Sequence, residues 1–233
     1  MKIETYILCH QEERLLPYTL RHYTQFSDVI LMEGHSQDRT VEIGESFGAK
    51  IMKVDTHDQV NDAIYLQIKN NAWKGSKADW VIICDTDELI YHPNIIEYLK
   101  NTTSTIFRPR LFNMYSEFFP SGDGQIYDEV KFGVDGGGKT NVFRPDQITE
   151  INYLPGCHNA RPEGNVILNL NSELITMHFK NLSRQYVIDR NKYLFSRLSD
   201  VNKLYKWGWH VGKGEEAVNK DFDDVQEQLI KIL

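Results

Sequence analysis

The stretch WVIICDTDE, residues 80–88, joins an uninterrupted apolar run to a group of carboxylates. Such a run is typical of a central parallel strand that is covered on both faces. Three similar strands are predicted before it, at residues 3–8, 28–32 and 49–54. Helices are predicted between them at 12–23, from about residue 36 or 38 to 48, and at 59–73. This alternation of strands and helices predicts a parallel α/β sheet with right-handed crossovers.

The pattern changes after residue 107. Short aromatic and β-branched runs alternate with the turn-rich stretches SGDGQ and GVDGGGK up to residue 180, which predicts an α+β elaboration. Helices are predicted at 183–198 and 215–233. The length of 233 residues predicts a single domain, 1–233, with three parts at 1–107, 108–180 and 181–233.

Composition excludes several classes of protein. The net charge of −7 disfavours a nucleic-acid partner, which would require a basic face. No apolar run approaches the ~20 residues of a membrane span, and the N-terminus turns polar too soon for a secretion signal. Cys9, Cys84 and Cys157 are odd in number and far apart, as expected of reduced thiols. We therefore expect a cytoplasmic protein, which could sit at the inner face of the membrane.

Carboxylates follow the strand at residues 80–84. Ligands of open α/β sheets bind beyond the carboxyl ends of the strands. Asp85 and Asp87, with Thr86 and Glu88 beside them, stand at such an end and could hold a divalent cation such as Mg²⁺ or Mn²⁺. We expect Asp87 to be exposed there. The alternative is an acidic, solvated turn.

Two further polar loops follow the first and second strands, CHQEE at 9–13 and EGHSQDRT at 33–40. Glu33 could accept a hydrogen bond from a nucleobase or ribose, and Ser36 and Asp38 could cap the next helix. Cys9, His10 and Glu12 belong to the first loop. Because all three loops follow carboxyl ends, we expect them to form one crevice, although well-capped βα loops without a ligand are the alternative.

The second half of the chain contributes histidines and a lysine. His178, in ITMHFKNLS, could complete a metal site, and Lys180 could contact a phosphate. His158, in LPGCHNARPEG, lies in a turn that suits an acceptor pocket or a proton transfer. Trp207 and Trp209 could be core residues or platforms for sugar rings.

Together these motifs resemble the bacterial family-2-like glycosyltransferases of the GT-A fold. YILCHQEERLLPYTLRHY resembles the opening strand and helix of that family, and LMEGHSQDRTVEI its Asp-Asp-Gly-Ser-x-Asp-x-Thr loop. DWVIICDTDELI resembles its DxD segment in the variant that continues with Glu. KTNVF, PGCHNARPEG and MHFKNLS extend the resemblance over most of the chain. The resemblance implies a GT-A, Rossmann-like, mostly parallel sheet flanked by helices, with 1–107 as the nucleotide-sugar half and 108–180 as the acceptor half.

The resemblance also implies an activity. It predicts a metal-dependent transfer of a sugar, with inversion, from a nucleoside diphosphate donor to a glycan or lipid-linked acceptor in surface polysaccharide synthesis. The implied metal ligands for Mn²⁺ or Mg²⁺ are Asp85, Asp87 and His178, and Lys180 would bind the diphosphate. The implied nucleotide-binding residues are Cys9, His10, Glu12, Glu33, Ser36, Asp38, Lys69, Asp85 and Thr86. Glu33 replaces the usual Asp of the family, and Cys9-His10 replaces a Tyr-Asn pair.

Inversion requires a base that takes the proton of the acceptor hydroxyl. The candidates are His158, Asp128, Glu129 and Asp135, and we rank His158 first because the ordinary pKa of imidazole is near neutral. One alternative function is a nucleotidyltransferase, which would require a glycine-rich, basic loop after the first strand. Another is a non-catalytic domain that binds a nucleotide sugar or a metal. The acidic helix at 215–233 favours packing or a homodimer over peripheral membrane association.

Overall fold

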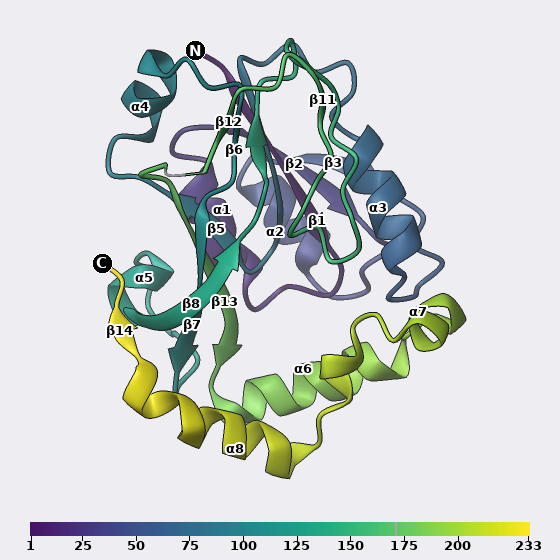
Figure 1. The fold of residues 1–233 in the computed structure, drawn as a ribbon. Coiled ribbons are helices and arrows are strands. Elements are labelled where there is room, and N and C mark those ends of the chain that lie inside the picture. The colour runs from purple at the N-terminus through teal and green to yellow at the C-terminus, as the bar shows by residue number, and fades with distance from the viewer. Residues whose placement is uncertain (171) are drawn as a thin grey trace.

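A seven-stranded sheet forms the centre of the computed structural model, which describes residues 1–170 and 172–233 (Figure 1). Its order is β12-β6-β9-β4-β1-β2-β3. Strands β1 to β4 of this sheet are mutually parallel, whereas β9 runs antiparallel to both β4 and β6. The predicted parallel α/β core is therefore confirmed, with a mixed extension at one side. The bounds are β1 (Ile3–Cys9), β2 (Asp28–Glu33), β3 (Lys50–Lys53), β4 (Trp80–Asp85), β6 (Ile106–Phe107), β9 (Val142–Phe143) and β12 (Leu168–Asn169).

A second sheet has five strands in the order β14-β8-β7-β13-β5. Its members are β5 (Glu88–Tyr91), β7 (Arg110–Ser116), β8 (Phe132–Gly138), β13 (Ile175–Leu182) and β14 (Ile230–Lys231), and a separate pair joins β10 (Ile148–Glu150) to β11 (Glu163–Gly164). The chain crosses from the first sheet to the second in the turn Thr86 and Asp87, between β4 and β5. The sequence pattern did not predict β5, which forms by antiparallel pairing with β13.

Both faces of β4 are buried, as the apolar run predicts. Trp80, Ile82 and Cys84 belong to one hydrophobic cluster, and Val81 and Ile83 belong to another. This division follows from the two-residue period of a strand, which sends successive side chains to opposite faces. The predicted α+β elaboration up to residue 180 is also observed, as short strands and the one-turn helix α5 (Ile126–Glu129).

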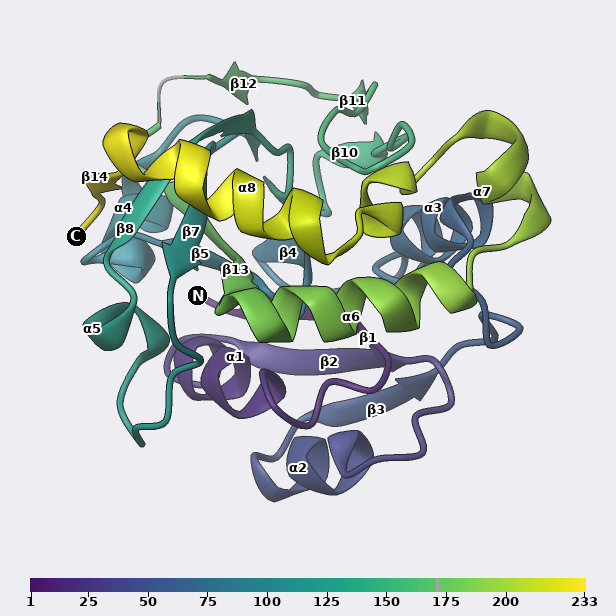
Figure 2. The same cartoon turned by 90° about the horizontal axis from the view of Figure 1, so that it is seen from below.

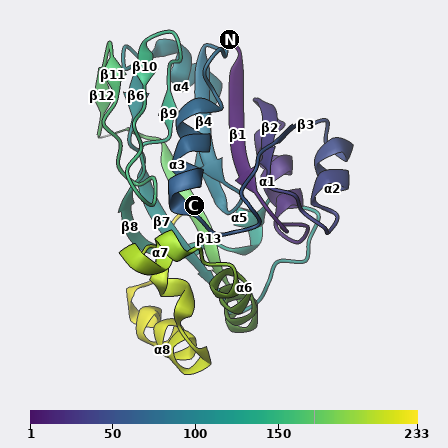
Figure 3. The same ribbon diagram turned by 90° about the vertical axis from the view of Figure 1, so that its right-hand side faces the viewer.

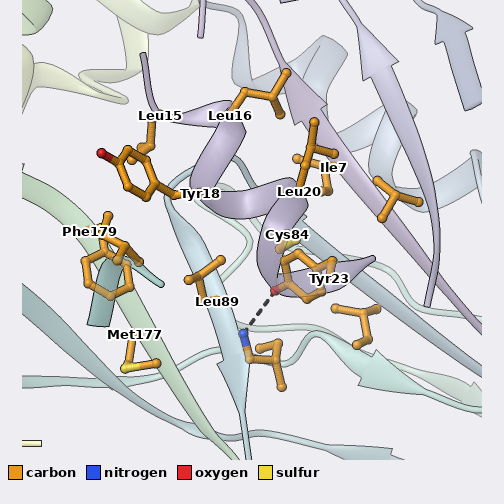
Figure 4. Close-up of a cluster of buried hydrophobic side chains, with 14 of the residues drawn as sticks. Ile7, Leu15, Leu16, Tyr18, Leu20, Tyr23, Cys84, Leu89, Met177 and Phe179 are labelled. Carbon is orange, nitrogen blue, oxygen red and sulfur yellow. Dashed lines mark hydrogen bonds between the residues drawn. The ribbon is translucent and has the colours of Figure 1, made fainter. Parts of the chain in front are cut away.

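Helix α1 (Leu16–Tyr23) covers one face of the central sheet (Figure 4). Leu16 and Leu20 of this helix are buried in the cluster that contains Ile7 and Cys84. The hydroxyl of Tyr23 accepts a hydrogen bond from the backbone N–H of Ile90 at 3.0 Å and donates to the carbonyl of Glu88 at 2.9 Å. The helix thereby fixes the position of β5 relative to the first sheet.

Several helices begin later than the sequence predicts. Helix α1 begins at Leu16, with Pro17 in its first turn, where the missing N–H costs no hydrogen bond. Helix α2 (Thr40–Ser46) begins after Asp38, whose carboxylate accepts from the backbone N–H of Thr40, and Gly48 follows it with a φ of +75°. Helix α3 (Asp62–Asn71) begins after Asn61, whose side chain caps it. The first residue of each helix is therefore set locally, by a proline in the first turn or by a side chain that caps the backbone N–H groups.

The C-terminal helices gather against one end of the sheets (Figures 2 and 3). Helix α6 (Arg184–Ser196) is followed by α7 (Asp200–Tyr205), the 3-10 turn η1 (Trp209–Gly212) and α8 (Glu215–Val225). The remaining helix, α4 (Ile95–Asn101), lies between β5 and β6 in the chain. Val218 and Phe222 of α8 are buried with Ile188 of α6, so the predicted packing of this helix is confirmed. The predicted extension of the helix to residue 233 is wrong. The chain continues as η2 (Gln226–Gln228) and β14, in which Ile230 pairs with Gly133 of β8.

Over the described residues, no helix is both long and apolar enough to cross a lipid bilayer. Cys9, Cys84 and Cys157 are buried free thiols, as their spacing predicts.

Candidate active site

A cavity of about 640 Å³ lies beyond the carboxyl ends of β1 and β4. Cys9 and His10 line it after β1, and Asp85, Thr86 and Asp87 line it after β4. Strand β13, helices α3, α6 and α8, the turn η1 and residues 156–158 also contribute to its wall. Two of the three loops that we expected in one crevice therefore meet here. The third, residues 33–40, does not line the cavity.

The carboxylate of Asp85 is held by two lysines. Its Oδ1 accepts from Lys69 Nζ at 2.5 Å, and its Oδ2 accepts from Lys139 Nζ at 3.0 Å. Lys139 also donates to both carboxylate oxygens of Glu88, at 2.6 and 2.7 Å. Burial would raise the pKa of Asp85, but the two ammonium groups outweigh it and hold this pKa well below its usual range. The two lysines therefore keep Asp85 ionised and fix the orientation of its carboxylate group.

The carboxylate of Asp87 is buried rather than exposed, which corrects our expectation for this residue; it is 5% exposed. Its Oδ2 accepts from Arg190 Nη1 at 2.7 Å and lies 3.4 Å from Nε2 of His178. Burial would raise the pKa of Asp87, but His178 and Arg190 outweigh it and hold this pKa well below its usual range. Asp87 is therefore an anion inside the protein.

Arg190 joins Asp87 to Glu12. Its Nη2 donates to Oε1 of Glu12 at 3.0 Å, so one guanidinium group orients two carboxylates. Burial raises the pKa of Glu12 to about 7, although Arg190 opposes the rise. The pair of carboxylates thus shares one cation, and Glu12 is the member that is more easily protonated.

Asp87 and His178 fit a divalent cation. Oδ1 of Asp87 is buried and makes no hydrogen bond in the structure. The other oxygen, Oδ2, accepts from Arg190 and lies 3.4 Å from Nε2 of His178, so an ion bound to the free Oδ1 would lie near the imidazole. Asp85 does not fit as a direct ligand, because both of its oxygens already accept from lysines. Within the described part of the chain, no three His, Cys, Asp or Glu side chains gather around one point. Mg²⁺ and similar ions, however, often take one or two protein ligands and fill the other positions with water and substrate phosphates.

Strand β13 sends alternate side chains into the cavity. His178 and Lys180 line it, whereas Met177 and Phe179 between them are buried in the core. No side chain in the described ranges forms a hydrogen bond or ion pair with the Lys180 ammonium group, and burial lowers its pKa. Lys180 is therefore a cation that an anionic ligand could pair with.

His158 also lines the cavity. Burial lowers the pKa of its imidazole, and the nearby lysine Lys139 adds to this effect. The imidazole is therefore neutral at neutral pH, the form that accepts a proton.

Three predicted nucleotide-binding residues do not reach the cavity. Glu33 is buried, and its Oε1 accepts from the backbone N–H of Ser36 at 2.5 Å. Ser36 Oγ accepts from the backbone N–H of Gln11, and Asp38 accepts from that of Glu13. Ser36 and Asp38 thus join the 33–40 loop to the 9–13 loop, whereas the Glu33 bond lies within the 33–40 loop. The bonded oxygens of all three side chains serve the backbone of these loops.

The three carboxylates predicted as alternative bases also lie outside the cavity lining. Asp128 accepts from the backbone N–H of Gln125 at the start of α5, and Glu129 accepts from that of Gly122. Asp135 is paired with Arg110 on the exposed surface of β8 and β7. Each carboxylate serves a local turn or strand pair, so His158 alone of the four candidates lines the cavity.

The sequence reasoning missed Arg190. The residue lies on the same side of α6 as Val187 and Leu194, which also line the cavity, so it interrupts an apolar stripe at helical spacing. An arginine within such a stripe indicates that its guanidinium group pairs with a buried carboxylate. His210 of η1 was missed as well, because no local pattern indicates that this turn lies over the cavity.

No protein-family model matches the chain, and no curated protein sequence matches it. Among solved structures, the chain is similar to glucosyl-3-phosphoglycerate synthase from Mycobacterium tuberculosis in complex with Mn²⁺, uridine diphosphate and glucosyl-3-phosphoglycerate. The identity is 14%, the TM-score is 0.34, and the match covers 48% of this chain and 44% of that one. It is also similar to TarS of S. aureus, with 11% identity, a TM-score of 0.47 and coverage of 96% and 43%. For residues 1–349 of TarS, the identity is 12%, the TM-score is 0.43 and the coverage is 87% and 68%. The match thus spans less than half the length of the synthase and of the longer TarS chain.

Proposed function

We propose that this chain is a glycosyltransferase that moves a sugar from a nucleoside diphosphate donor to an acceptor hydroxyl. The observation that carries the proposal is the meeting of Asp87, His178 and the unpaired Lys180 in one cavity beyond the carboxyl ends of parallel strands. A diphosphate carries negative charge, and it could contact both a cation held by Asp87 and His178 and the ammonium group of Lys180. The motif resemblance over most of the chain supports the same class.

The leaving group of such a transfer is a nucleoside diphosphate, on which negative charge develops as the sugar–phosphate bond breaks. A Mn²⁺ or Mg²⁺ ion held by Asp87 and His178 would supply Lewis-acid stabilisation of that charge. Lys180 binds the diphosphate from the same strand as His178. Arg190 holds the Asp87 carboxylate in a single orientation, as outer partners of metal ligands commonly do.

The nucleoside is assigned to the rim formed by the β1 and β4 ends. Asp85 keeps part of its carboxylate exposed to the cavity while Lys69 and Lys139 hold it, so it can accept from a ribose hydroxyl. His10 also lines the cavity, with Nδ1 bonded to the Gly34 carbonyl and Nε2 to the Tyr193 hydroxyl. We assign Cys9, Thr86 and Glu12 to the same rim.

His158 is the proposed base. It takes the proton of the acceptor hydroxyl as that oxygen attacks the sugar carbon, and the nucleoside diphosphate departs from the opposite face. A neutral imidazole is required for this step, in agreement with the lowered pKa of His158.

A nucleotidyltransferase would need free backbone N–H groups after β1 to hold phosphates. In this chain those groups are already bonded. Gln11 N–H donates to Ser36, Glu12 N–H donates to Thr40, and Glu13 N–H donates to Asp38. The loop therefore offers no phosphate cradle, and we favour the glycosyltransferase.

The test is to incubate the full chain with Mn²⁺ and a panel of nucleotide sugars, and to measure released nucleoside diphosphate by chromatography. We expect release from one donor class, and a loss of at least about 100-fold in Asp87→Asn. Asp28→Asn is the matched control, because Asp28 is an exposed carboxylate at the amino end of β2. A chain that binds a nucleotide but releases no diphosphate from any donor, with or without added acceptors, would instead be a non-catalytic binding domain.

A further inference from the structure

Residues 192–213 form a basic segment on an acidic protein. The segment runs from the end of α6 through α7 and η1 and contains Lys192, Arg197, Lys203, Lys206 and Lys213 but only one acid, Asp200. Its formal charge is +4, so the rest of the chain, with a total of −7, carries −11. Two of these cations are paired with acids outside the segment, Arg197 with Asp58 at 3.0 Å and Lys213 with Asp221 at 2.5 Å. The positive surface of the segment is therefore formed by Lys192, Lys203 and Lys206.

The same segment exposes large apolar side chains. Leu204 is 74% exposed, the highest value among the large hydrophobic residues that the structure describes, and Tyr205 and Trp209 are 61% and 53% exposed. Tyr193 and Phe195 of α6 are exposed nearby in the chain. Isolated exposed apolar residues need no explanation, but a group of aromatic and aliphatic side chains in one short segment does.

The lysines of this segment are not all neutralised. Within residues 1–170 and 172–233, neither Lys192 nor Lys206 forms an ion pair, and Lys206 Nζ lies 5.9 Å from the ring centre of Trp209. Lys203 is 3.6 Å from the exposed Asp200. Lysines beside exposed Trp and Tyr rings suit the boundary between lipid headgroups and acyl chains, where the rings sit at the headgroup level and the ammonium groups meet phosphates.

The segment is also the outer wall of the cavity. Leu194, Arg197, Gly208 and His210 line the cavity from within. Both Figure 1 and Figure 2 show α7 at the outer edge of the molecule, beyond the end of α6. A surface that met this segment would therefore lie close to the cavity.

We propose that residues 192–213 dock on an anionic lipid surface, with Leu204, Tyr205 and Trp209 entering the headgroup boundary. Leu204 and the lysines favour lipid over a glycan, because neutral sugars stack on aromatic rings and need neither an aliphatic side chain nor a net positive charge. The three lysines of this surface, Lys192, Lys203 and Lys206, also oppose a second copy of the segment across a two-fold axis. If the proposed function holds, docking brings the cavity to the membrane, and the acceptor is lipid-linked.

The test uses sedimentation of the full chain with vesicles of phosphatidylcholine alone or mixed with phosphatidylglycerol, without any donor. Failure of docking is thus separate from failure of the transferase. We expect binding only to the mixed vesicles, and weaker binding at high salt. The double variant Lys203→Glu/Lys206→Glu should lower the partition coefficient by about tenfold or more, whereas Lys100→Glu/Lys220→Glu, with the same charge change on exposed helices, should not.

An apolar pair of variants completes the test. Leu204→Ser should weaken binding to the mixed vesicles several-fold, and Leu170→Ser, at another exposed leucine, should leave it unchanged. Three results would overturn the proposal: no sedimentation with mixed vesicles, equal sedimentation with both kinds, or equal losses in the segment and control variants. Binding of a soluble oligosaccharide that Trp209→Ser abolishes, without vesicle binding, would identify the surface as a glycan platform instead.

Discussion

Nε2 of His178 in β13 lies 3.4 Å from Oδ2 of Asp87 in the turn between β4 and β5, although the two residues are far apart in the sequence. Antiparallel pairing of β13 with β5 produces this proximity, because His178 is in register with Glu88 and the Phe179 N–H donates to the Asp87 carbonyl at 2.7 Å. The metal-ligand pair that we propose therefore depends on β5. Any change that shifts the register of these strands would separate the two side chains.

Arg190→Lys tests the bridge between the two carboxylates. A lysine has one ammonium group and cannot repeat the two-armed contact of Arg190 with Asp87 and Glu12. We expect the Mn²⁺ concentration for half-maximal nucleotide binding to rise about 10-fold to 100-fold, measured by calorimetry. Arg184→Lys is the control, since Arg184 makes a similar contact with Glu117 at the surface. An unchanged Mn²⁺ requirement in Arg190→Lys would mean that the guanidinium does not orient Asp87 for metal.

Lys139→Met tests the buried network behind Asp85. The substitution removes the cation that neutralises Glu88 and half of the contacts of Asp85, and it leaves a buried carboxylate unpaired. We expect the free energy of unfolding to fall by about 3–5 kcal/mol in urea titrations. Lys220→Met, at an exposed i,i+4 pair on α8, should leave it unchanged within the error of the titration. Equal effects in both variants would show that the network is solvated and weak.

Glu33→Gln and Glu33→Ala test whether this residue touches the nucleotide. Gln keeps an oxygen that can accept from the Ser36 N–H, whereas Ala leaves that N–H unpaired and should cost about 1–3 kcal/mol of stability. We expect the nucleotide Kd of Glu33→Gln to change by less than about twofold. A loss of about tenfold or more in Glu33→Gln, with normal stability, would restore Glu33 to the nucleobase contact that the motif implies.

His22 makes stability depend on pH. Its Nε2 bonds with the Ile90 carbonyl at 2.9 Å, and burial lowers the pKa of the imidazole to about 4, below the ordinary value of 6.5. The unfolded chain therefore binds a proton between these two pKa values while the folded chain does not. The stability linked to His22 is present above pH 6.5 and is lost as the pH falls toward 4.

Between pH 7 and pH 5 this term amounts to about 2 kcal/mol of unfolding free energy. His22→Gln should remove that part of the pH dependence, even if the variant is less stable at pH 7. Urea unfolding of both proteins at the two pH values measures the difference. Parallel losses in wild type and variant would assign the pH dependence to other groups.

The parallel core could be predicted because its strands are continuous apolar runs, and Gly48 and Gly75 punctuate the helices between them. Strand β5 could not, since ELIY follows the carboxylates directly and becomes a strand only through pairing with β13. The end of α8 was missed for the same reason. Leu229 and Ile232 continue the helical spacing, but backbone pairing of Ile230 with β8 prevails.

Some residues of the candidate site could likewise be predicted from the sequence, and others could not. The proximity of Asp87 and His178 could be predicted because each follows or lies within a recognisable strand, and the fold brings such strands together. Their role as metal ligands stays a prediction. The place of Glu33 outside the cavity lining could not be predicted, because its bond to the Ser36 N–H is a local one that the motif does not reveal. Its contact with a nucleobase stays a prediction. Arg190 comes from a helix whose crossing over the cavity is set by packing far along the chain.

Calorimetric titration of UDP, GDP, CDP and dTDP into the full chain, each with Mn²⁺ and with EDTA, tests the central claim most directly. We predict that one nucleotide binds, that EDTA abolishes the binding, and that Asp87→Asn and His178→Ala each lose it while Asp28→Asn does not. If none of the four nucleotides binds in the presence of Mn²⁺, or if binding is equally tight in EDTA and in Asp87→Asn, the Asp87–His178 pair is not a metal centre for a nucleoside diphosphate.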